Sequence, residues 1–201
     1  ATVASGSAGG DGNYSNELDP QTFVPWIEAA GAAGQYVVLD LQPGRTDFLT
    51  QAKALEPLLR YPWVGLALDP EWRLGPDQTH LVQIGSVGAD EVNAVGDWLA
   101  ELTVANDLPP KLFVLHQFRF DMLHDRERVV TDRPELETLV HIDGQGGQPA
   151  KQATWRALTQ ENEQQRFWWG WKNFIDEDQP MLTPQETMSQ VAPIPDLITY
   201  Q

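Results

Sequence analysis

Short, continuous apolar runs recur along the chain, and the segments between them can form helices. Unbroken apolarity is typical of strands buried on both faces, as in a parallel sheet covered by helices. The alternation of such strands with helices predicts an α/β fold with right-handed crossovers. We expect strands at 36–39, 64–68, 112–115, 139–142, 167–171 and 197–200.

Helix signals precede several of the intervening segments. Asp19 and Pro20 offer an N-cap followed by proline in the first turn, and Thr183, Pro184 and Glu186 form a capping-box pattern. The segments with helical character are 20–33, 46–59, 89–105, 149–158 and 183–190.

A polar or charged cluster follows each of the first five runs, and this pattern distinguishes two α/β architectures. In a doubly wound sheet, only strand ends near the switch point line a ligand site, whereas in a barrel all of them converge on one face. The pattern favours a parallel (β/α) barrel. No dinucleotide-binding glycine pattern follows a strand, and 144–147 lacks both that spacing and a P-loop lysine.

The chain of 201 residues is short for a complete eight-unit barrel, which takes about 250 residues. We expect a single barrel-like domain over 1–201 with seven strands, of which 1–4 is the first. An N-terminal unit of the barrel would then be missing or replaced. In this interpretation 1–16 is a strand end plus a glycine-rich loop; the alternative is a flexible leader.

Composition narrows the classes of function. The formal net charge of −16 disfavours binding to nucleic acid or to an anionic membrane surface. The absence of cysteine excludes disulfides, thiolate nucleophiles and iron–sulfur clusters. No apolar stretch is long enough for membrane insertion, and the first residues given lack the basic flank and apolar core of a signal peptide. Many acidic residues and few lysines favour a secreted or cell-envelope location.

Asp69, Pro70 and Glu71 form the sharpest local signal for chemistry. Alternate residues that leave a strand point the same way, so the two carboxylates should lie together at the barrel mouth. Close carboxylates push their pKa values apart, as glycoside hydrolysis requires. Glu71 is the candidate general acid, with Trp72 as an apolar wall. In the alternative, Asp69 caps a turn and Glu71 is solvated.

Asp40 and Asp143 end other predicted strands, so either could be the second catalytic carboxylate. A separation of about 5 to 5.5 Å from Glu71 would indicate a retaining enzyme, and about 6.5 to 9.5 Å an inverting one. The alternative for both residues is a helix cap or a salt bridge in a loop.

Polar groups near the predicted mouth are candidates for substrate binding: His116, Gln117, Arg119 and Gln145. The imidazole, amides and guanidinium could bind sugar hydroxyls or fix a carboxylate. His116, His141 and Asp143, with Asp40 or Asp69, also raise a metal interpretation, but no tight ligand spacing supports it. We therefore predict neither a metal nor another cofactor.

The segment 168–174 has an unusual density of tryptophan. Sugar rings stack on indole, so inward-facing Trp169 and Trp171 would form a floor for a carbohydrate, with Trp168 outward against helices. The alternative is that these rings fill the core. Lys172 could contact an anionic substituent or pair with a nearby acid. Tyr200, on the last predicted strand, could orient a carboxylate or belong to the core.

These strand-end motifs together resemble a group of uncharacterised secreted or lipid-anchored actinobacterial proteins with a glycosidase-like TIM barrel. The matching segments are 39–45, 68–73, 116–119, 141–146 and 169–174. The resemblance implies that residues preceding this chain supply the first strands. More distantly, Asp69 and Glu71 are similar to the strand-end acids of chitinase-like barrel hydrolases, although the acidic signature upstream is absent because 65–68 is apolar.

Three functional hypotheses follow. The first is a glycoside hydrolase acting on a polysaccharide or oligosaccharide through Glu71 and Asp143 or Asp40. The second is a carbohydrate-binding or cell-envelope-binding protein without turnover. The third is a metal-assisted hydrolase that uses His116, His141 and Asp143.

Overall fold

A curled sheet of six parallel strands forms the centre of the protein in a computed structural model, which describes residues 1–160 and 165–201. The strand order is β10-β9-β8-β6-β4-β3, so each strand lies beside the next in sequence. This order lacks the switch point of a doubly wound sheet. The strands are β3 (Val37–Leu41), β4 (Val64–Leu68), β6 (Lys111–His116), β8 (Leu136–Ile142), β9 (Trp168–Asn173) and β10 (Leu197–Tyr200).

The sheet is a half-barrel and not a closed (β/α) barrel. Within the described residues, β3 and β10 pair on one side only. All six predicted strands of the sheet are present, and the bounds of β4 and β10 agree with the prediction. The expected seventh strand is not part of this sheet.

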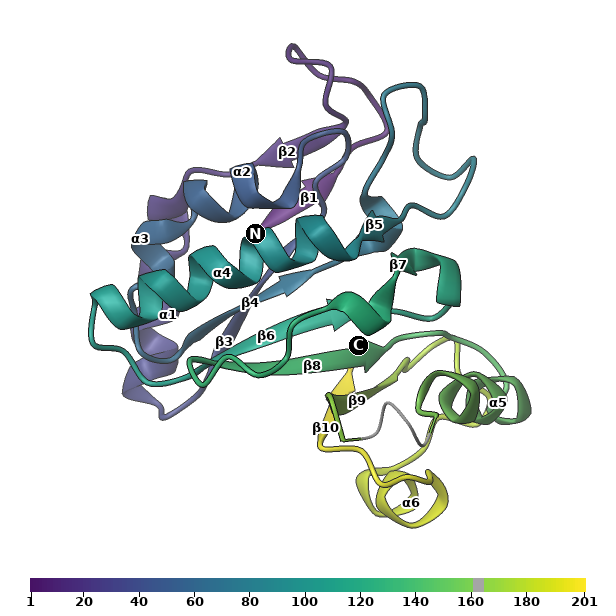
Figure 1. Cartoon of the computed structure of the whole chain (residues 1–201). Coiled ribbons are helices and arrows are strands. Elements are labelled where there is room, and N and C mark those ends of the chain that lie inside the picture. The colour runs from purple at the N-terminus through teal and green to yellow at the C-terminus, as the bar shows by residue number, and fades with distance from the viewer. Residues whose placement is uncertain (161–164) are drawn as a thin grey trace.

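Helices cover the outer, convex face of the sheet. Figure 1 shows α2, α3 and α4 alongside β3, β4 and β6, whereas α5 and α6 flank β9 and β10. The helices are α1 (Val24–Ala32), α2 (Phe48–Ala54), α3 (Glu56–Leu59), α4 (Ala89–Ala105), α5 (Gln148–Leu158) and α6 (Pro184–Gln190). Short 3-10 helices are η1 (Pro20–Thr22), η2 (Pro70–Trp72), η3 (Phe120–Met122) and η4 (Arg126–Arg128).

The predicted helices are present, but two of them are divided. Segment 20–33 consists of η1 and α1, and segment 46–59 consists of α2 and α3. Pro57 lies in the first turn of α3, where its missing N–H removes a bond that a continuous helix would need. The capping box of Thr183 and Glu186 at the start of α6 is confirmed.

Alternation along the strands gives the sheet two different faces. Side chains such as Leu39, Leu66 and Phe113 are buried beneath the helices in the main core. A smaller cluster of Ala67 and Val114 with Leu139 occupies the concave face, which no helix of the described residues covers. The concave face is therefore the open side of the half-barrel.

The prediction that 1–4 is the first barrel strand is wrong. β1 (Thr2–Ala4) pairs antiparallel with β2 (Ser15–Glu17) in a separate two-stranded sheet. This hairpin lies at the edge of β3, where the Gln42 amide donates to Thr2 Oγ1 and the Ala4 amide donates to Gln42 Oε1, both at 2.9 Å. The backbone of β1 thus forms its strand hydrogen bonds with β2, whereas the backbone of a barrel strand would form them with β3.

A second small sheet joins two loops above the main one. β5 (Val87–Gly88) pairs in parallel with β7 (Leu123–His124), which ties the loop after β4 to the loop after β6. None of the helices in the described residues is long and apolar enough to cross a membrane.

Candidate functional site

The carboxyl ends of the parallel strands bring ionisable side chains to one mouth of the half-barrel. Asp40 lies near the end of β3, His116 ends β6, and Asp69 and Asp143 directly follow β4 and β8. The strands are parallel and alternate residues share a face, so these groups lie together above the concave side.

His116 is buried between two of these carboxylates. Its Nδ1 lies 2.9 Å from Asp143 Oδ2, and its Nε2 lies 3.4 Å from Asp40 Oδ2. Burial alone would lower the pKa of His116, but the charges of Asp40 and Asp143 raise it well above its usual value. The imidazole is therefore a cation held between two acids.

The two partners of His116 respond in the opposite direction. Burial raises the pKa of Asp40 and of Asp143, but the adjacent imidazolium outweighs burial and holds both pKa values below their usual range. The second oxygen of each carboxylate, Oδ1, is buried without a hydrogen-bond partner. Both groups are ionised at neutral pH, and each retains an unused acceptor.

Asp69 and Glu71 behave differently from that pair. Burial, reinforced by the charges of Asp40 and Asp143 and opposed by His116, raises the pKa of Asp69 to about 8. Burial and the charge of Asp143 also raise the pKa of the half-buried Glu71. The mouth thus combines two carboxylates that stay ionised with two carboxyls that hold their protons to higher pH.

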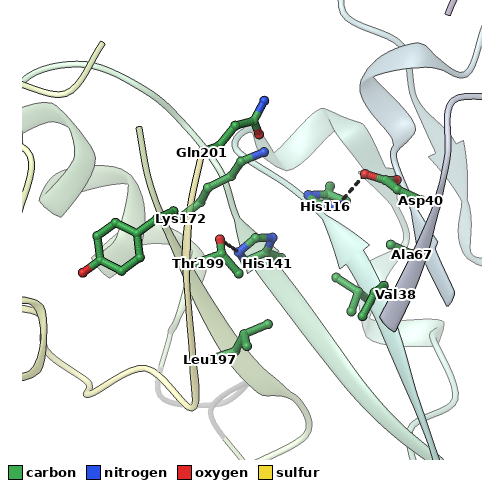
Figure 2. A pocket seen from close by; sticks show the side chains of 11 residues that line it. Val38, Asp40, Ala67, His116, His141, Lys172, Leu197, Thr199 and Gln201 are labelled. Carbon is green, nitrogen blue, oxygen red and sulfur yellow. Dashed lines mark hydrogen bonds and ion pairs between the residues drawn. The ribbon is translucent and has the colours of Figure 1, made fainter. Parts of the chain in front are cut away.

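A pocket of about 290 Å³ extends from this mouth along the concave face (Figure 2). Its upper part is lined by Asp40, His116, His141, Lys172 and Thr199, and its lower part by apolar residues that include Val114 and Leu197. A ligand seated there would meet charged groups at one end and apolar side chains at the other.

His141 is a neutral member of the pocket wall. Its Nε2 lies 2.9 Å from Thr199 Oγ1, and its ring is 5.0 Å from the ring of His116. Burial and the charge of His116 lower the pKa of His141 to about 3. Thr199 and Gln201 were missed by the sequence analysis. Alternation around Tyr200 on the last strand is the signal that could have found them.

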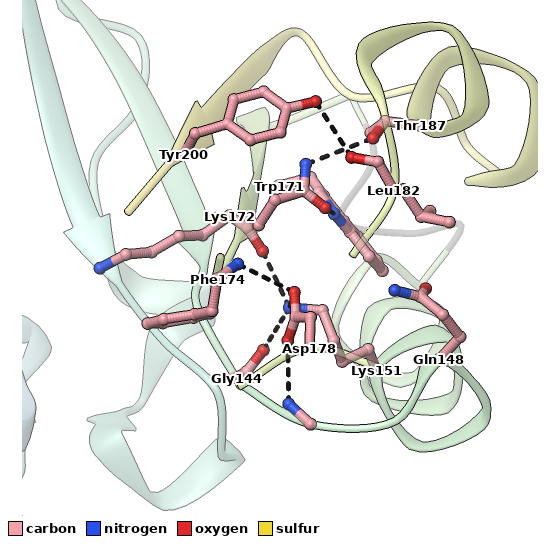
Figure 3. A network of polar contacts seen from close by, with 12 residues as sticks. Gly144, Gln148, Lys151, Trp171, Lys172, Phe174, Asp178, Leu182, Thr187 and Tyr200 are labelled. Atoms are coloured by element: carbon pink, nitrogen blue, oxygen red, sulfur yellow. Dashed lines mark hydrogen bonds and ion pairs between the residues drawn. The ribbon is translucent and has the colours of Figure 1, made fainter. Parts of the chain in front are cut away.

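A buried polar network supports the loops that follow β8 and β9 (Figure 3). Lys151 Nζ lies 2.9 Å from Asp178 Oδ2 and donates to the carbonyl oxygens of Gly144 at 2.6 Å and Lys172 at 2.8 Å. Asp178 in turn accepts from the amides of Gly146 and Phe174, both at 2.9 Å. The network fixes the loop next to Asp143 against the end of β9.

The indole floor expected from Trp169 and Trp171 is absent, and this expectation is corrected. Both side chains are buried on the helix-covered face, where Trp171 packs edge-to-face on Trp155 of α5 at 5.5 Å. Gly170 and Lys172 take the concave positions instead. A Cβ on Gly170 would lie 2.6 Å from the His141 ring, so a residue without a side chain is required there.

Other predicted binding residues lie away from the pocket. The side chain of Gln117 is buried and bonds to the Arg119 carbonyl oxygen and to Arg126. Arg119 forms an exposed ion pair with Asp121, and the exposed Gln145 does not line the pocket.

Trp72 and Tyr200 also have contacts outside the acid cluster. Trp72 packs on His80, with ring centroids 5.2 Å apart, in the loop after η2. Tyr200 lines the pocket, but its hydroxyl donates to the Leu182 carbonyl oxygen at 3.3 Å, on the side facing α6.

The metal interpretation finds no support in the donor geometry. No group of three or more His, Asp or Glu side chains within 1–160 and 165–201 is arranged to hold a metal ion. Both nitrogens of His116 face carboxylates, and Nε2 of His141 faces Thr199. The site is built from ion pairs within the protein.

Comparison of the chain with protein-family models, with curated proteins and with solved structures gave no match.

Proposed function

We propose that the protein is a glycoside hydrolase-like enzyme that acts on a polysaccharide by carboxylate acid–base catalysis, on an incomplete (β/α) barrel. One observation carries the proposal: parallel strands bring four carboxyl groups to one mouth, two of them beside the His116 imidazolium and two away from it, and these surroundings displace their pKa values in opposite directions. Such separation is the signature of groups that act as acid and base at the same pH. We also propose that the protein is secreted or associated with the cell envelope, where such polysaccharides are found.

Glu71 is the proposed general acid. Its carboxyl is half-buried and so can reach a substrate, and burial together with Asp143 favours its protonated form. Asp69 has the higher pKa but is almost fully buried. A neutral Asp69 would donate a hydrogen bond within the site and not transfer a proton to the leaving group.

Asp143 is the proposed partner carboxylate, because its charge acts on Glu71 and its Oδ1, although buried, has no hydrogen-bond partner among the residues described. In the reaction, Glu71 gives its proton to the glycosidic oxygen as the bond from C1 to that oxygen breaks. Asp143 acts either as the base that takes a proton from the water attacking C1 or as the nucleophile at C1, and the stereochemistry of the product distinguishes the two. Asp40, on the other side of His116, is the alternative base.

The test measures the release of reducing ends from a panel of polysaccharides by the parent protein and by Glu71→Gln, Asp143→Asn and Asp40→Asn. General acid–base groups contribute roughly 10²- to 10⁴-fold to rate, so Glu71→Gln and Asp143→Asn should lose at least about 100-fold. The control is Glu101→Gln, which alters an exposed carboxylate on α4 and should leave the rate unchanged.

Binding is measured on the same panel to separate the remaining hypotheses. Substrate binding without turnover by the parent protein would contradict the proposal and favour a carbohydrate-binding or cell-envelope-binding protein. Loss of activity with a chelator and its recovery with a divalent ion would favour the metal-assisted hydrolase instead.

A further inference from the structure

Lys172 projects from β9 onto the concave face, beside the acid cluster. Its side chain lines the pocket and lies near Gln201 and His141 (Figure 2). The position follows from alternation along the strand, because Trp169 and Trp171 are buried on the other face. Lys172 therefore brings an ammonium group to the place where a ligand would enter.

The ammonium of Lys172 differs from those of the two other lysines in or near the sheet. Lys111 Nζ donates to the Tyr61 and Val64 carbonyl oxygens, and Lys151 Nζ is bound in the network of Figure 3. In the described part of the chain, Lys172 Nζ has no hydrogen bond or ion pair; it lies 4.9 Å from the centroid of the Phe174 ring. Its charge is available to a ligand.

The charge of Lys172 lowers the pKa of Asp143 and opposes the rise in the pKa of Glu71, but among the described residues no acid of the mouth forms an ion pair with it. His116 already contacts both Asp40 and Asp143 within 3.4 Å. Beside His116, His141 of the neighbouring strand and Thr199 bond to each other and are uncharged partners in the wall. Among the described side chains that line this pocket, Lys172 is thus the cation that no acid contacts.

The net charge of the chain bears on what Lys172 can do for a ligand. At a net charge of −16, long-range attraction cannot bring an anion to this protein. Screening limits such long-range effects to roughly 10 Å at 0.1 M salt, so an anionic ligand must be recognised by a cation in direct contact. Lys172 is placed to do so.

We propose that the substrate carries an anionic substituent and that Lys172 binds it, so that the ligand is an acidic polysaccharide. A uronate carboxylate, a sulfate ester and a phosphate ester share this chemistry. The inference deepens the proposed function and names its class of substrate. Thr199 and Gln201, which line the same pocket, supply polar groups beside the anion.

The experiment measures binding by calorimetry, so it does not require turnover. The probes are an oligogalacturonate, its methyl ester, and sulfated and phosphorylated forms of one neutral oligosaccharide. The parent protein should bind at least one acidic probe at least tenfold more tightly than the uncharged counterpart. Lys172→Met should abolish that preference, Lys172→Arg should retain most of it, and 0.5 M salt should weaken it.

Lys53→Met is the matched control, because Lys53 is an exposed lysine of α2 that does not line the pocket. It should leave binding unchanged, and circular dichroism checks that each variant is folded. Equal binding of acidic and uncharged probes by the parent, or an unaltered preference in Lys172→Met, would overturn the inference. Cleavage of neutral polysaccharides alone would overturn it while leaving the proposed hydrolase intact. Lysine-dependent binding without any cleavage would support it and contradict the hydrolase.

Discussion

His116 links the acids of the mouth, and its removal should be costly. The buried imidazolium contacts Asp40 and Asp143 and keeps both carboxylates ionised. Without it, the buried Asp143 and the partly exposed Asp40 would lose the cation that contacts both of them. Breaking a buried ion pair by removing one partner costs about 3–5 kcal/mol.

His116→Asn should therefore destabilise the protein by an amount that depends on pH. The raised pKa of His116 gives stability that is present below its unfolded pKa and lost as pH rises through its folded pKa. The lowered pKa values of Asp40 and Asp143 give stability that is present above about pH 4 and lost as pH falls. The loss in the free energy of unfolding should thus be largest near pH 6.

Urea unfolding of His116→Asn at pH 3 and pH 6 checks this prediction, with His124→Asn, an exposed histidine, as the control. A loss that is equal at the two pH values would mean that His116 acts by packing and not by charge.

Asp69→Asn should have the opposite effect on stability. Burial raises the pKa of Asp69 to about 8 in the native state. At any pH between the unfolded and the folded pKa, Asp69 must therefore take up a proton when the protein folds. Its burial thus destabilises the native state increasingly as pH rises through this range. An amide removes that penalty, because one pKa unit corresponds to about 1.4 kcal/mol. The variant should be more stable than the parent at pH 8, by on the order of 2 kcal/mol, and similar to it at pH 4. A variant less stable than the parent at pH 8 would show that Asp69 is ionised in the native state.

At this scale the sequence predicts which groups lie at strand ends, but not which face each side chain takes. The run 167–171 is apolar or glycine throughout, so its composition does not distinguish the two faces. Position 170 lies on the concave side against His141 of the neighbouring strand, where only a glycine fits. Because side chains alternate along the strand, Trp169 and Trp171 are then buried beneath the helices.

Local signals predict the helices and strands well. The bounds of α4 agree with the amphipathic segment, and the capping box of α6 is formed as its four residues predict. The location of β1 could not be predicted in the same way. β1 could pair either with β3 in the main sheet or with the nearby β2, and the signals within the segment do not distinguish the two partners. In the structure it pairs antiparallel with β2.

The elements β8, α5 and β9 are held together at the mouth by Lys151 and Asp178. Both side chains are almost completely buried, so either variant alone, Lys151→Met or Asp178→Asn, should lose about 3–5 kcal/mol. In the double variant neither partner is left as an unpaired buried charge. Its loss should be smaller than the sum of the two single losses by more than 1 kcal/mol, as determined by urea unfolding in a double-mutant cycle. Additive losses would show that the two charges are independent.

At the scale of the whole molecule, the order of the strands explains why the ionisable groups converge. Each parallel strand is added beside the previous one, so all carboxyl ends meet at one side of a curled sheet. The strand-end pattern in the sequence predicts this winding. It does not predict how far the sheet closes, because closure depends on which segments pair with β3 and β10.

The central claim is that the mouth holds ionised and protonated carboxyls at the same pH. Carbon-13 NMR titration of the Asp and Glu side chains tests it most directly, with resonances assigned by Asp40→Asn, Asp69→Asn, Glu71→Gln and Asp143→Asn. We expect one resonance that titrates near pH 8 and is lost in Asp69→Asn, and two that titrate below their usual range and are lost in Asp40→Asn and Asp143→Asn. Four carboxyls that all titrate near pH 4 would contradict the account.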